Sequence, residues 1–265
     1  MQNRVCPITF KLKEDCLYIT YDETIVEKYK QFKALKENRV LGIDLNPEYF
    51  GISVIEFNED DSFKAIHKEV IDISELNEQS TNKVKFELQQ INNKIIKLCN
   101  YYKCSTLSVE DLKFKKSNKF PSKKLNRLCK NKFRYSTIKT HLQTLCNTYG
   151  VKFVEVNAAY SIVVGNLNYG NDSTPDMVAA SIEIARRAYK KFSKGWFYPP
   201  MQIERVKEVL MNQWKKDLEL NFNSWPELSN QIKKLGLKYR FQLDGSMAVL
   251  SKYYKKKFIF LYNFL

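Results

Sequence analysis

The sequence predicts an α/β domain built around a mixed sheet, and three observations support this prediction. Three strand-like segments come first, at 40–45, 49–57 and 63–73, and their short connections favour an antiparallel meander. Helix-like and strand-like segments then alternate over 83–192. Hydrophobic residues make up 44% of the 265 residues and aromatic residues 14%, so the chain can fill a core of ordinary size. Helices packed against a sheet of mixed strand direction follow from this order.

The individual elements are predicted from the spacing of their apolar residues. Segments 8–12 and 17–21 alternate apolar and polar residues, which predicts a small N-terminal hairpin. Apolar residues recur at a helical period within 83–102. The other predicted elements are helix 23–35, strand 105–109, helix 125–149, strand 151–156, helix 176–192 and further helices within 200–265. Three antiparallel strands followed by this alternation give a five-stranded sheet with the element order of the ribonuclease H-like fold.

Three parts are predicted along the chain: the hairpin and first helix at 1–37, the α/β domain at 38–195 with a basic helical insertion at 113–149, and a helical C-terminal extension at 196–265. No apolar run approaches the roughly 20 residues that span a bilayer, and the first residues lack the apolar part of a secretory signal. The six cysteines contain no C-x-x-C pair, which predicts reduced thiols and no structural zinc. We therefore expect a cytoplasmic protein without a membrane partner.

Positive charge is in excess and is concentrated in one segment. The chain has 44 Lys and Arg against 29 Asp and Glu, and this net charge of +15 favours a polyanionic partner such as nucleic acid. Segment 113–134 is rich in basic residues, contains no acid and includes aromatic residues, a combination that suits phosphates and stacked bases. The alternative is a solvated loop whose aromatic residues pack into the core. The residues of this segment that we expect to contact nucleic acid are Lys115, Lys116, Lys119, Lys123, Lys124, Arg127, Lys130, Lys132 and Arg134.

Three carboxylates lie within or directly beside predicted strands and helices. Asp44 lies inside the apolar strand 40–45, where an ionised Asp is costly unless it is paired or binds a cation. Glu110 follows strand 105–109, and Asp176 begins a helix. In a mixed sheet the first and fourth strands can be neighbours, which would bring Asp44 and Glu110 side by side under the start of that helix. Each residue alone also has an ordinary alternative, as a cap, a salt-bridge partner or an acid favoured by the helix dipole.

Converging carboxylates of this kind predict a metal site. Oxygen ligands suit Mg²⁺ or Mn²⁺, and two ions about 4 Å apart can clamp the attacking water and the leaving oxygen in phosphodiester hydrolysis. In such a site Asp44 would bridge both ions, Glu110 would hold one and Asp176 the other. No His base is needed, which fits a chain with 2 His. The segment Gly42-Ile-Asp44 also occurs in actin-like ATPases, but those need Gly-rich phosphate loops that this sequence lacks.

Four motifs occur in the order of a known nuclease family. They are Val40-Leu-Gly-Ile-Asp-Leu-Asn46 with Gly51-Ile-Ser53, Leu107-Ser-Val-Glu-Asp-Leu-Lys113, Asn157-Ala-Ala-Tyr-Ser161, and Asp176-Met-Val-Ala-Ala-Ser-Ile-Glu-Ile-Ala-Arg-Arg187. The set resembles the RuvC-like nuclease core of the transposon-encoded TnpB (OrfB) proteins and of the related type V CRISPR effectors. The resemblance implies a RuvC-like fold, Mg²⁺-dependent DNA cleavage by Asp44, Glu110 and Asp176, and a bacterial, phage-host or mobile-element setting. It also implies that the basic insertion contacts nucleic acid.

The sequence departs from that family in three places, one of which is the tail beyond Phe192, where no family motif is recognised. The RNA-guided members have a long recognition lobe before the first acid, whereas here only a hairpin and a helix precede it. We therefore expect DNA as the partner, together with either a guide RNA or a partner chain that supplies the lobe. The family's zinc ribbon has no counterpart in 162–171, which lacks Cys, so no zinc is expected. The alternatives are a stand-alone Holliday-junction resolvase, acting as a homodimer with two active sites, and a non-cleaving nucleic-acid-binding module.

Several nearby polar residues have two interpretations each. Arg186 is expected to reach a phosphate bidentately, and the alternative is a solvent-facing position. Asp111 is interpreted as a cap or salt-bridge partner, because it lies on the strand face opposite Glu110. Asp172 is either a fourth acid of the site or part of a turn. Tyr160 and Ser161 either line the site or satisfy backbone groups of a loop.

Overall fold

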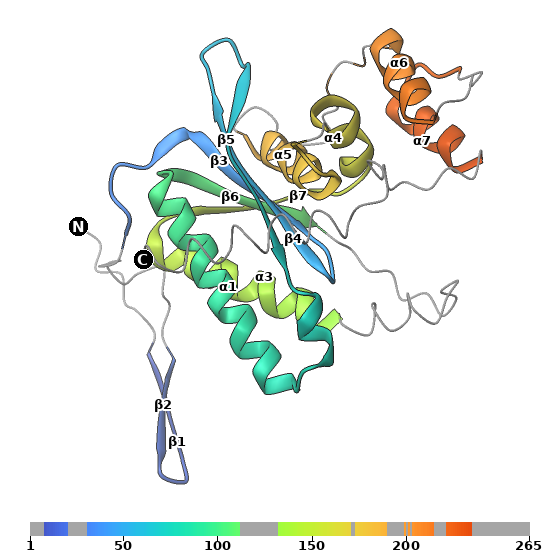
Figure 1. The fold of residues 1–265 in the computed structure, drawn as a ribbon. Coiled ribbons are helices and arrows are strands. Elements are labelled where there is room, and N and C mark those ends of the chain that lie inside the picture. Colours follow the sequence, from blue (N-terminus) through green and yellow to red (C-terminus); the bar gives the residue numbers. More distant parts are fainter. Residues whose placement is uncertain are drawn as a thin grey trace.

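The computed structural model contains a five-stranded sheet with helices on both faces (Figure 1). It describes residues 8–20, 31–111, 132–170, 173–189, 199, 201, 203–214 and 221–234. The strands of this sheet are β3 (Lys36–Leu45), β4 (Tyr49–Phe57), β5 (Phe63–Asp72), β6 (Cys104–Asp111) and β7 (Lys152–Asn157). They lie in the order β5-β4-β3-β6-β7, so the strand that carries Asp44 is the central one.

Strand directions in the sheet follow from the length of the connections. β3 pairs antiparallel with β4, and β4 pairs antiparallel with β5, because short turns join them. β3 pairs parallel with β6, and β6 pairs parallel with β7, because the chain crosses over between them. The predicted meander, the mixed sheet and the ribonuclease H-like element order are therefore confirmed.

Each face of the sheet is covered by different helices (Figure 1). The helices are α1 (Thr81–Tyr101) and α3 (Lys132–Tyr149) on one face and α5 (Asp176–Ala188) on the other, with a short 3₁₀ helix, η1 (Ser74–Glu78), before α1. Side chains of β3 alternate between the two faces. Leu41 and Ile43 pack with the helices α1 and α3, whereas Val40 packs with α5.

Helix α5 lies unusually close to the sheet, because two strand positions opposite it have no side chain. A Cβ added at Gly42 would lie 2.2 Å from the backbone oxygen of Ser181. A Cβ added at Gly51 would lie 2.2 Å from the backbone oxygen of Met177. The predicted helix 176–192 is confirmed at its start but ends at Ala188, and residues 190–192 lie outside the described part of the chain.

Three more helices pack together beside α5. They are α4 (Ser161–Tyr169), α6 (Ile203–Trp214) and α7 (Trp225–Lys234). Their shared cluster includes Val164, Leu210 and Leu228, all fully buried. Helix α4 is a correction, because the sequence predicts no helix between strand 151–156 and helix 176–192; its apolar residues pack against α6 and α7. None of the described helices is both long enough and apolar enough to cross a membrane.

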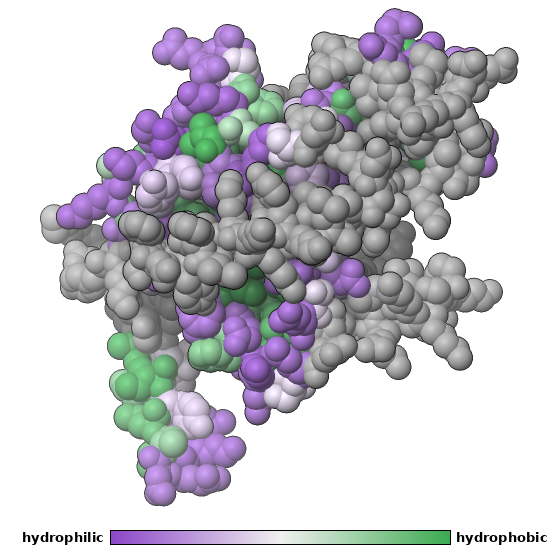
Figure 2. All heavy atoms as spheres, in the orientation of Figure 1, coloured by the Kyte–Doolittle hydropathy of each residue, from purple (hydrophilic) through white to green (hydrophobic). Residues whose placement is uncertain are grey.

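The N-terminal hairpin is confirmed as a separate two-stranded sheet of β1 (Thr9–Lys13) and β2 (Cys16–Thr20). All ten of its residues are exposed. Phe10 pairs with Ile19 and Leu12 pairs with Leu17, so one face of the ribbon is apolar, and Figure 2 shows apolar side chains gathered along it. The expected helix 23–35 is wrong for residues 31–35, which are not helical; the preceding residues 21–30 lie outside the described part.

Candidate active site

The register of the sheet brings Asp44 and Glu110 together. Ile43 of β3 lies opposite Val109 of β6, and Asp44 and Glu110 are the next residues of these two strands. Because side chains alternate along a strand, both carboxylates lie on the sheet face that α5 covers. Both are buried, at 8% and 7% exposure. Two neighbouring strand ends therefore place two acids inside the domain.

Asp176 begins α5 and joins this pair. Burial is the largest cause that raises the pKa of Asp44 well above its usual range, and the charges of Glu110 and Asp176 raise it further. Burial also raises the pKa of Glu110, which a hydrogen bond from Ser161 and the charge of Arg187 partly offset. Asp44 is therefore near enough to both of the other predicted acids for their charges to act on it.

The chemistry of these donors fits a hard divalent cation. All three side chains offer carboxylate oxygens, which Mg²⁺ and Mn²⁺ prefer. Among the described residues, no three His, Cys, Asp or Glu side chains already stand in the arrangement of a metal site. In this arrangement Asp44 interacts with the other two acids through their charges.

Among the described residues, two contact Glu110 through a hydroxyl group: Ser161, which the sequence placed either in the site or in a loop, and Tyr135, which had no predicted role at the acids. The Ser161 hydroxyl, at the first residue of α4, donates a hydrogen bond to Glu110 Oε1. The Tyr135 hydroxyl donates to the backbone oxygen of Glu110, and its ring packs against the core, so this aromatic residue of the basic segment is structural. The motif Asn157-Ala-Ala-Tyr-Ser161 was the available signal for Ser161, whereas no pattern pointed to Tyr135.

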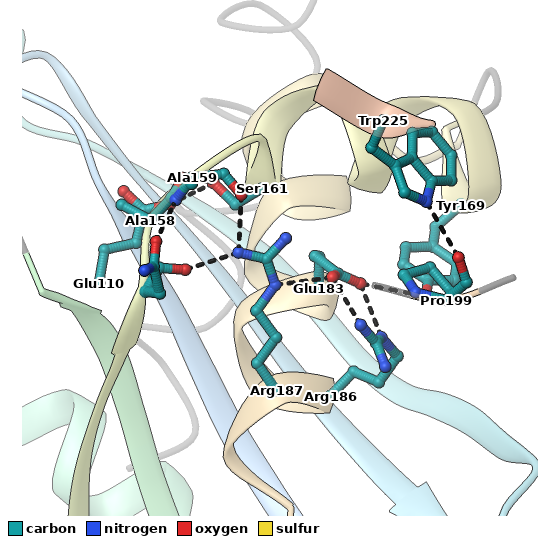
Figure 3. Close-up of polar contacts among 11 residues, drawn as sticks. Glu110, Ala158, Ala159, Ser161, Tyr169, Glu183, Arg186, Arg187, Pro199 and Trp225 are labelled. Atoms are coloured by element: carbon teal, nitrogen blue, oxygen red, sulfur yellow. Dashed lines mark hydrogen bonds and ion pairs between the residues drawn. The ribbon is translucent and has the colours of Figure 1, made fainter. Parts of the chain in front are cut away.

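Arg186 does not occupy the phosphate-binding position expected from the sequence. It is 4% exposed, and its guanidinium donates to both carboxylate oxygens of Glu183 at 2.8 Å. Arg187 is equally buried and lies between Glu183 and the turn that precedes α4 (Figure 3). A buried guanidinium bound to a carboxylate is not available to nucleic acid, so we do not include Arg186 in the proposed DNA surface.

Most of the predicted nucleic-acid contacts lie outside the described residues. These predicted contacts are Lys115, Lys116, Lys119, Lys123, Lys124, Arg127 and Lys130. Asp172, which was interpreted either as a fourth acid or as part of a turn, also lies outside the described residues. Lys132 and Arg134 belong to the first turn of α3, where the structure describes the backbone. Asp111 pairs with Asn157 of β7 and lies on the strand face opposite the acids.

Of the comparisons with known proteins, the one with solved structures gives matches. No protein-family model and no curated protein matches this chain. Among solved structures, a Thermus thermophilus RuvC in complex with a Holliday-junction substrate is 14% identical with a TM-score of 0.43, over 58% of this chain and 94% of that one. A yeast mitochondrial Holliday-junction resolvase is 14% identical with a TM-score of 0.37, over 68% and 87% of the two chains. An Aquifex aeolicus member of the Ppx/GppA family is 12% identical with a TM-score of 0.30, over 49% and 38%.

The fold is defined by the sheet itself. Its order, its two antiparallel and two parallel pairings and the helices on both faces are those of a ribonuclease H-like fold. Its buried acids lie where the central strand and its parallel neighbour end, under the start of α5.

Proposed function

We propose that this chain is a Mg²⁺- or Mn²⁺-dependent endonuclease that hydrolyses phosphodiester bonds in DNA. The observation that carries the proposal is Asp44, a buried carboxylate on which the charges of Glu110 and Asp176 both act. Within the described residues, Asp44 has no ion-pair partner. Buried charge of one sign destabilises the fold unless a cation neutralises it. A divalent cation is the neutralising group that oxygen donors favour.

Each acid has a proposed role that follows from its position. Asp44, on which the charges of both other acids act, would bridge two ions. Glu110 would hold one of them and Asp176 the other. Two bound ions supply positive charge at the scissile phosphate and lower the pKa of the attacking water. In the hydrolysis a water oxygen bonds to phosphorus, the bond to the leaving oxygen breaks, and the water protons pass to the leaving oxygen and to solvent.

DNA is the substrate that the charge and the motif resemblance favour. The net charge of +15 suits a polyanion, and the ten basic residues of 113–134 supply most of it. The motifs resemble those of TnpB and type V effectors, so one form of the proposal is cleavage guided by an RNA or by a partner chain. The other form is a junction resolvase acting as a homodimer. The choice of substrate separates these two forms.

The test is metal-dependent cleavage of labelled DNA by the purified chain. Single-stranded, duplex and four-way-junction substrates are incubated with MgCl₂ or MnCl₂. We expect Asp44→Ala to lower the cleavage rate at least about 100-fold, because losing a bridging ligand removes several kcal/mol of transition-state stabilisation. DNA affinity should be retained. The matched control is Asp111→Ala, which removes the adjacent carboxylate on the opposite strand face and should cut like the wild type.

The outcomes distinguish the candidate functions. Preferential cutting of the four-way junction by a dimer would support the resolvase form. Cutting only after addition of a co-purifying RNA would support the guided form. Equal cutting by the wild type and Asp44→Ala would contradict the metal site. DNA binding without cutting of any substrate, with or without co-purifying RNA, would support the non-cleaving binding module instead.

A further inference from the structure

Among the described residues, a hydrogen bond holds one of the two carboxylate oxygens of Glu110. Ser161 donates a hydrogen bond to Oε1 (Figure 3). No described residue donates to Oε2. Because the side chain is 7% exposed, its rotamer is set by these contacts rather than by water. The contacts that position Ser161 therefore also determine where Oε2 of Glu110 lies.

The turn that carries Ser161 has a backbone conformation that needs support. Tyr160, which precedes Ser161, has φ of 60° and ψ of 12°, in the left-handed region. For a residue other than Gly this conformation is strained and persists only where the surroundings enforce it. Inside the turn, the Ala159 amide donates to Asn157 Oδ1 at 2.8 Å. The Ser161 amide donates to the Ala158 oxygen at 3.3 Å, and the Ser161 hydroxyl lies 3.1 Å from the same oxygen. A further anchor comes from outside the turn.

Arg187 supplies that anchor from the far end of α5. Its Nη1 donates to the backbone oxygens of Asn157 at 2.5 Å and Ala159 at 2.9 Å. Its Nε donates to Glu183 Oε1 at 2.7 Å, and Glu183 is fully buried. Arg186 binds the same carboxylate at 2.8 Å. The guanidinium of Arg187 is thus fixed on one side by the Glu183 carboxylate and on the other by the turn.

A buried ionic group of this kind is better explained by positioning than by stability. Replacing buried ion pairs with apolar side chains is often neutral or stabilising, because removing charges from water is costly. Glu183, Arg186 and Arg187 are all at most 4% exposed. Of the two arginines, Arg187 has hydrogen bonds to the Ser161 turn. The group therefore connects the helix that begins with Asp176 to the turn that contacts Glu110.

We propose that Ser161 and Arg187 are positioning residues for Glu110. Arg187 fixes the turn, the turn fixes Ser161, and the Ser161 hydroxyl orients the carboxylate so that Oε2 is left to bind a divalent cation. This inference rests on the proposed nuclease function. It assigns to α5 two roles in the same site, since the helix supplies Asp176 at its start and anchors Glu110 from its end.

The test measures Mn²⁺ binding to the full-length chain by calorimetry, with MnCl₂ as the titrant and no DNA present. Ser161→Ala and Arg187→Lys should weaken Mn²⁺ binding about tenfold, the lower range for the loss of a residue that orients a metal ligand. Ser161→Thr keeps the hydroxyl and should restore binding to within about twofold. Arg186→Lys is the matched control, because Arg186 shares the burial and the Glu183 partner of Arg187, and it should leave the Mn²⁺ dissociation constant unchanged.

A second measurement uses cleavage. In Ser161→Ala the Mg²⁺ concentration for half-maximal rate should rise about tenfold, while DNA affinity stays at the wild-type value and saturating Mg²⁺ recovers most of the rate. Equal weakening of Mn²⁺ binding by Arg186→Lys and Arg187→Lys would overturn the inference, since it would indicate a general effect of disturbing the buried ion pair. So would wild-type Mn²⁺ binding by Ser161→Ala in a protein whose cleavage still depends on Asp44. A wild-type chain that binds no Mn²⁺ would overturn both the inference and the proposed nuclease.

Discussion

Asp44 illustrates how a single residue can be costly for the fold and necessary for the proposed reaction. It replaces an apolar side chain in the central strand, between buried neighbours that pack on both faces of the sheet. Burial and two nearby negative charges raise its pKa, which means that the folded state tolerates its charged form poorly. In the proposed site the same negative surroundings would attract a cation. Asp44 would then lower the stability of the metal-free protein and raise that of the metal-bound protein.

The first prediction at this scale is that Asp44→Asn stabilises the metal-free protein. At pH 7 it should raise the free energy of unfolding by about 1 kcal/mol or more, which is roughly 2–4 °C in Tm for a domain of this size. Because the folded pKa of Asp44 is raised, the folded state binds its proton more tightly, so metal-free wild type should gain stability as the pH falls from 7 towards about 4. The variant should lack this component.

Differential scanning calorimetry in EDTA and in MgCl₂ checks this prediction. Mg²⁺ should raise the Tm of the wild type and have little effect on Asp44→Asn, because a ligand that binds only the folded state stabilises it. A lower metal-free Tm for Asp44→Asn would show that Asp44 is held by favourable contacts and would contradict the electrostatic interpretation.

At the scale of elements, the placement of α5 decides whether the acids meet. The helix crosses the sheet at very short distance, because Gly42 of β3 leaves room for its backbone near Ser181. Asp176, at the start of this helix, acts electrostatically on Asp44, at the end of β3. A change in helix–sheet spacing would therefore affect the site as well as the core.

We predict that Gly42→Ala destabilises the fold by about 1–3 kcal/mol, the range for overpacking a close contact. The added Cβ would meet the Ser181 backbone oxygen at 2.2 Å and Ala185 Cβ at 2.7 Å. Since the nearer atom belongs to the backbone, the second change Ala185→Gly should rescue little of the loss. Urea unfolding of the single and double variants measures this. Full rescue by Ala185→Gly would show that the side-chain contact, not the backbone contact, limits the packing.

Elements also differ in how well the sequence predicts them. The strand β4 has the predicted bounds 49–57, because apolar residues in a short run between turns are a local signal. Helix α4 was missed, because its Gly165, Asn166 and Asn168 are typical of loops. It is helical since Val164 and Leu167 pack against α6 and α7, which are distant in sequence. In this segment the local sequence is typical of a loop, whereas tertiary packing stabilises a helix.

At the scale of the whole molecule, the acids of the proposed site and most of the basic residues belong to different segments. Asp44 and Glu110 are buried in the α/β domain and Asp176 is partly buried, whereas the largest group of basic residues belongs to 113–134. Substitutions in the two regions should therefore have different effects. Substitution of an acid should lower the cleavage rate at constant DNA affinity. Substitution of basic residues in 113–134 should alter DNA affinity and its dependence on salt.

We predict that reversing the charge of Lys123, Lys124 and Arg127 to Glu weakens DNA binding and flattens its salt dependence. Each lost phosphate contact should reduce the slope of log K against log salt by about 0.7–0.9, because fewer counterions are released. Fluorescence anisotropy with labelled DNA at several KCl concentrations measures both quantities. An unchanged slope would mean that this segment does not contact phosphates and would favour the solvated-loop alternative.

The sequence by itself determined the order of the strands along the chain, the antiparallel meander and the N-terminal hairpin, and it singled out the three acids as site candidates. These features depend on local periodicity and on residues that are exceptional in their own segment, such as Asp44 in an apolar strand. Only the tertiary structure decided that Ser161 contacts Glu110, that Arg187 anchors the Ser161 turn and that Arg186 is buried against Glu183. The physical reason is that burial and hydrogen-bond partners depend on which distant segments pack together. An arginine near the end of a helix has the same local sequence whether it meets solvent, a phosphate or a buried carboxylate.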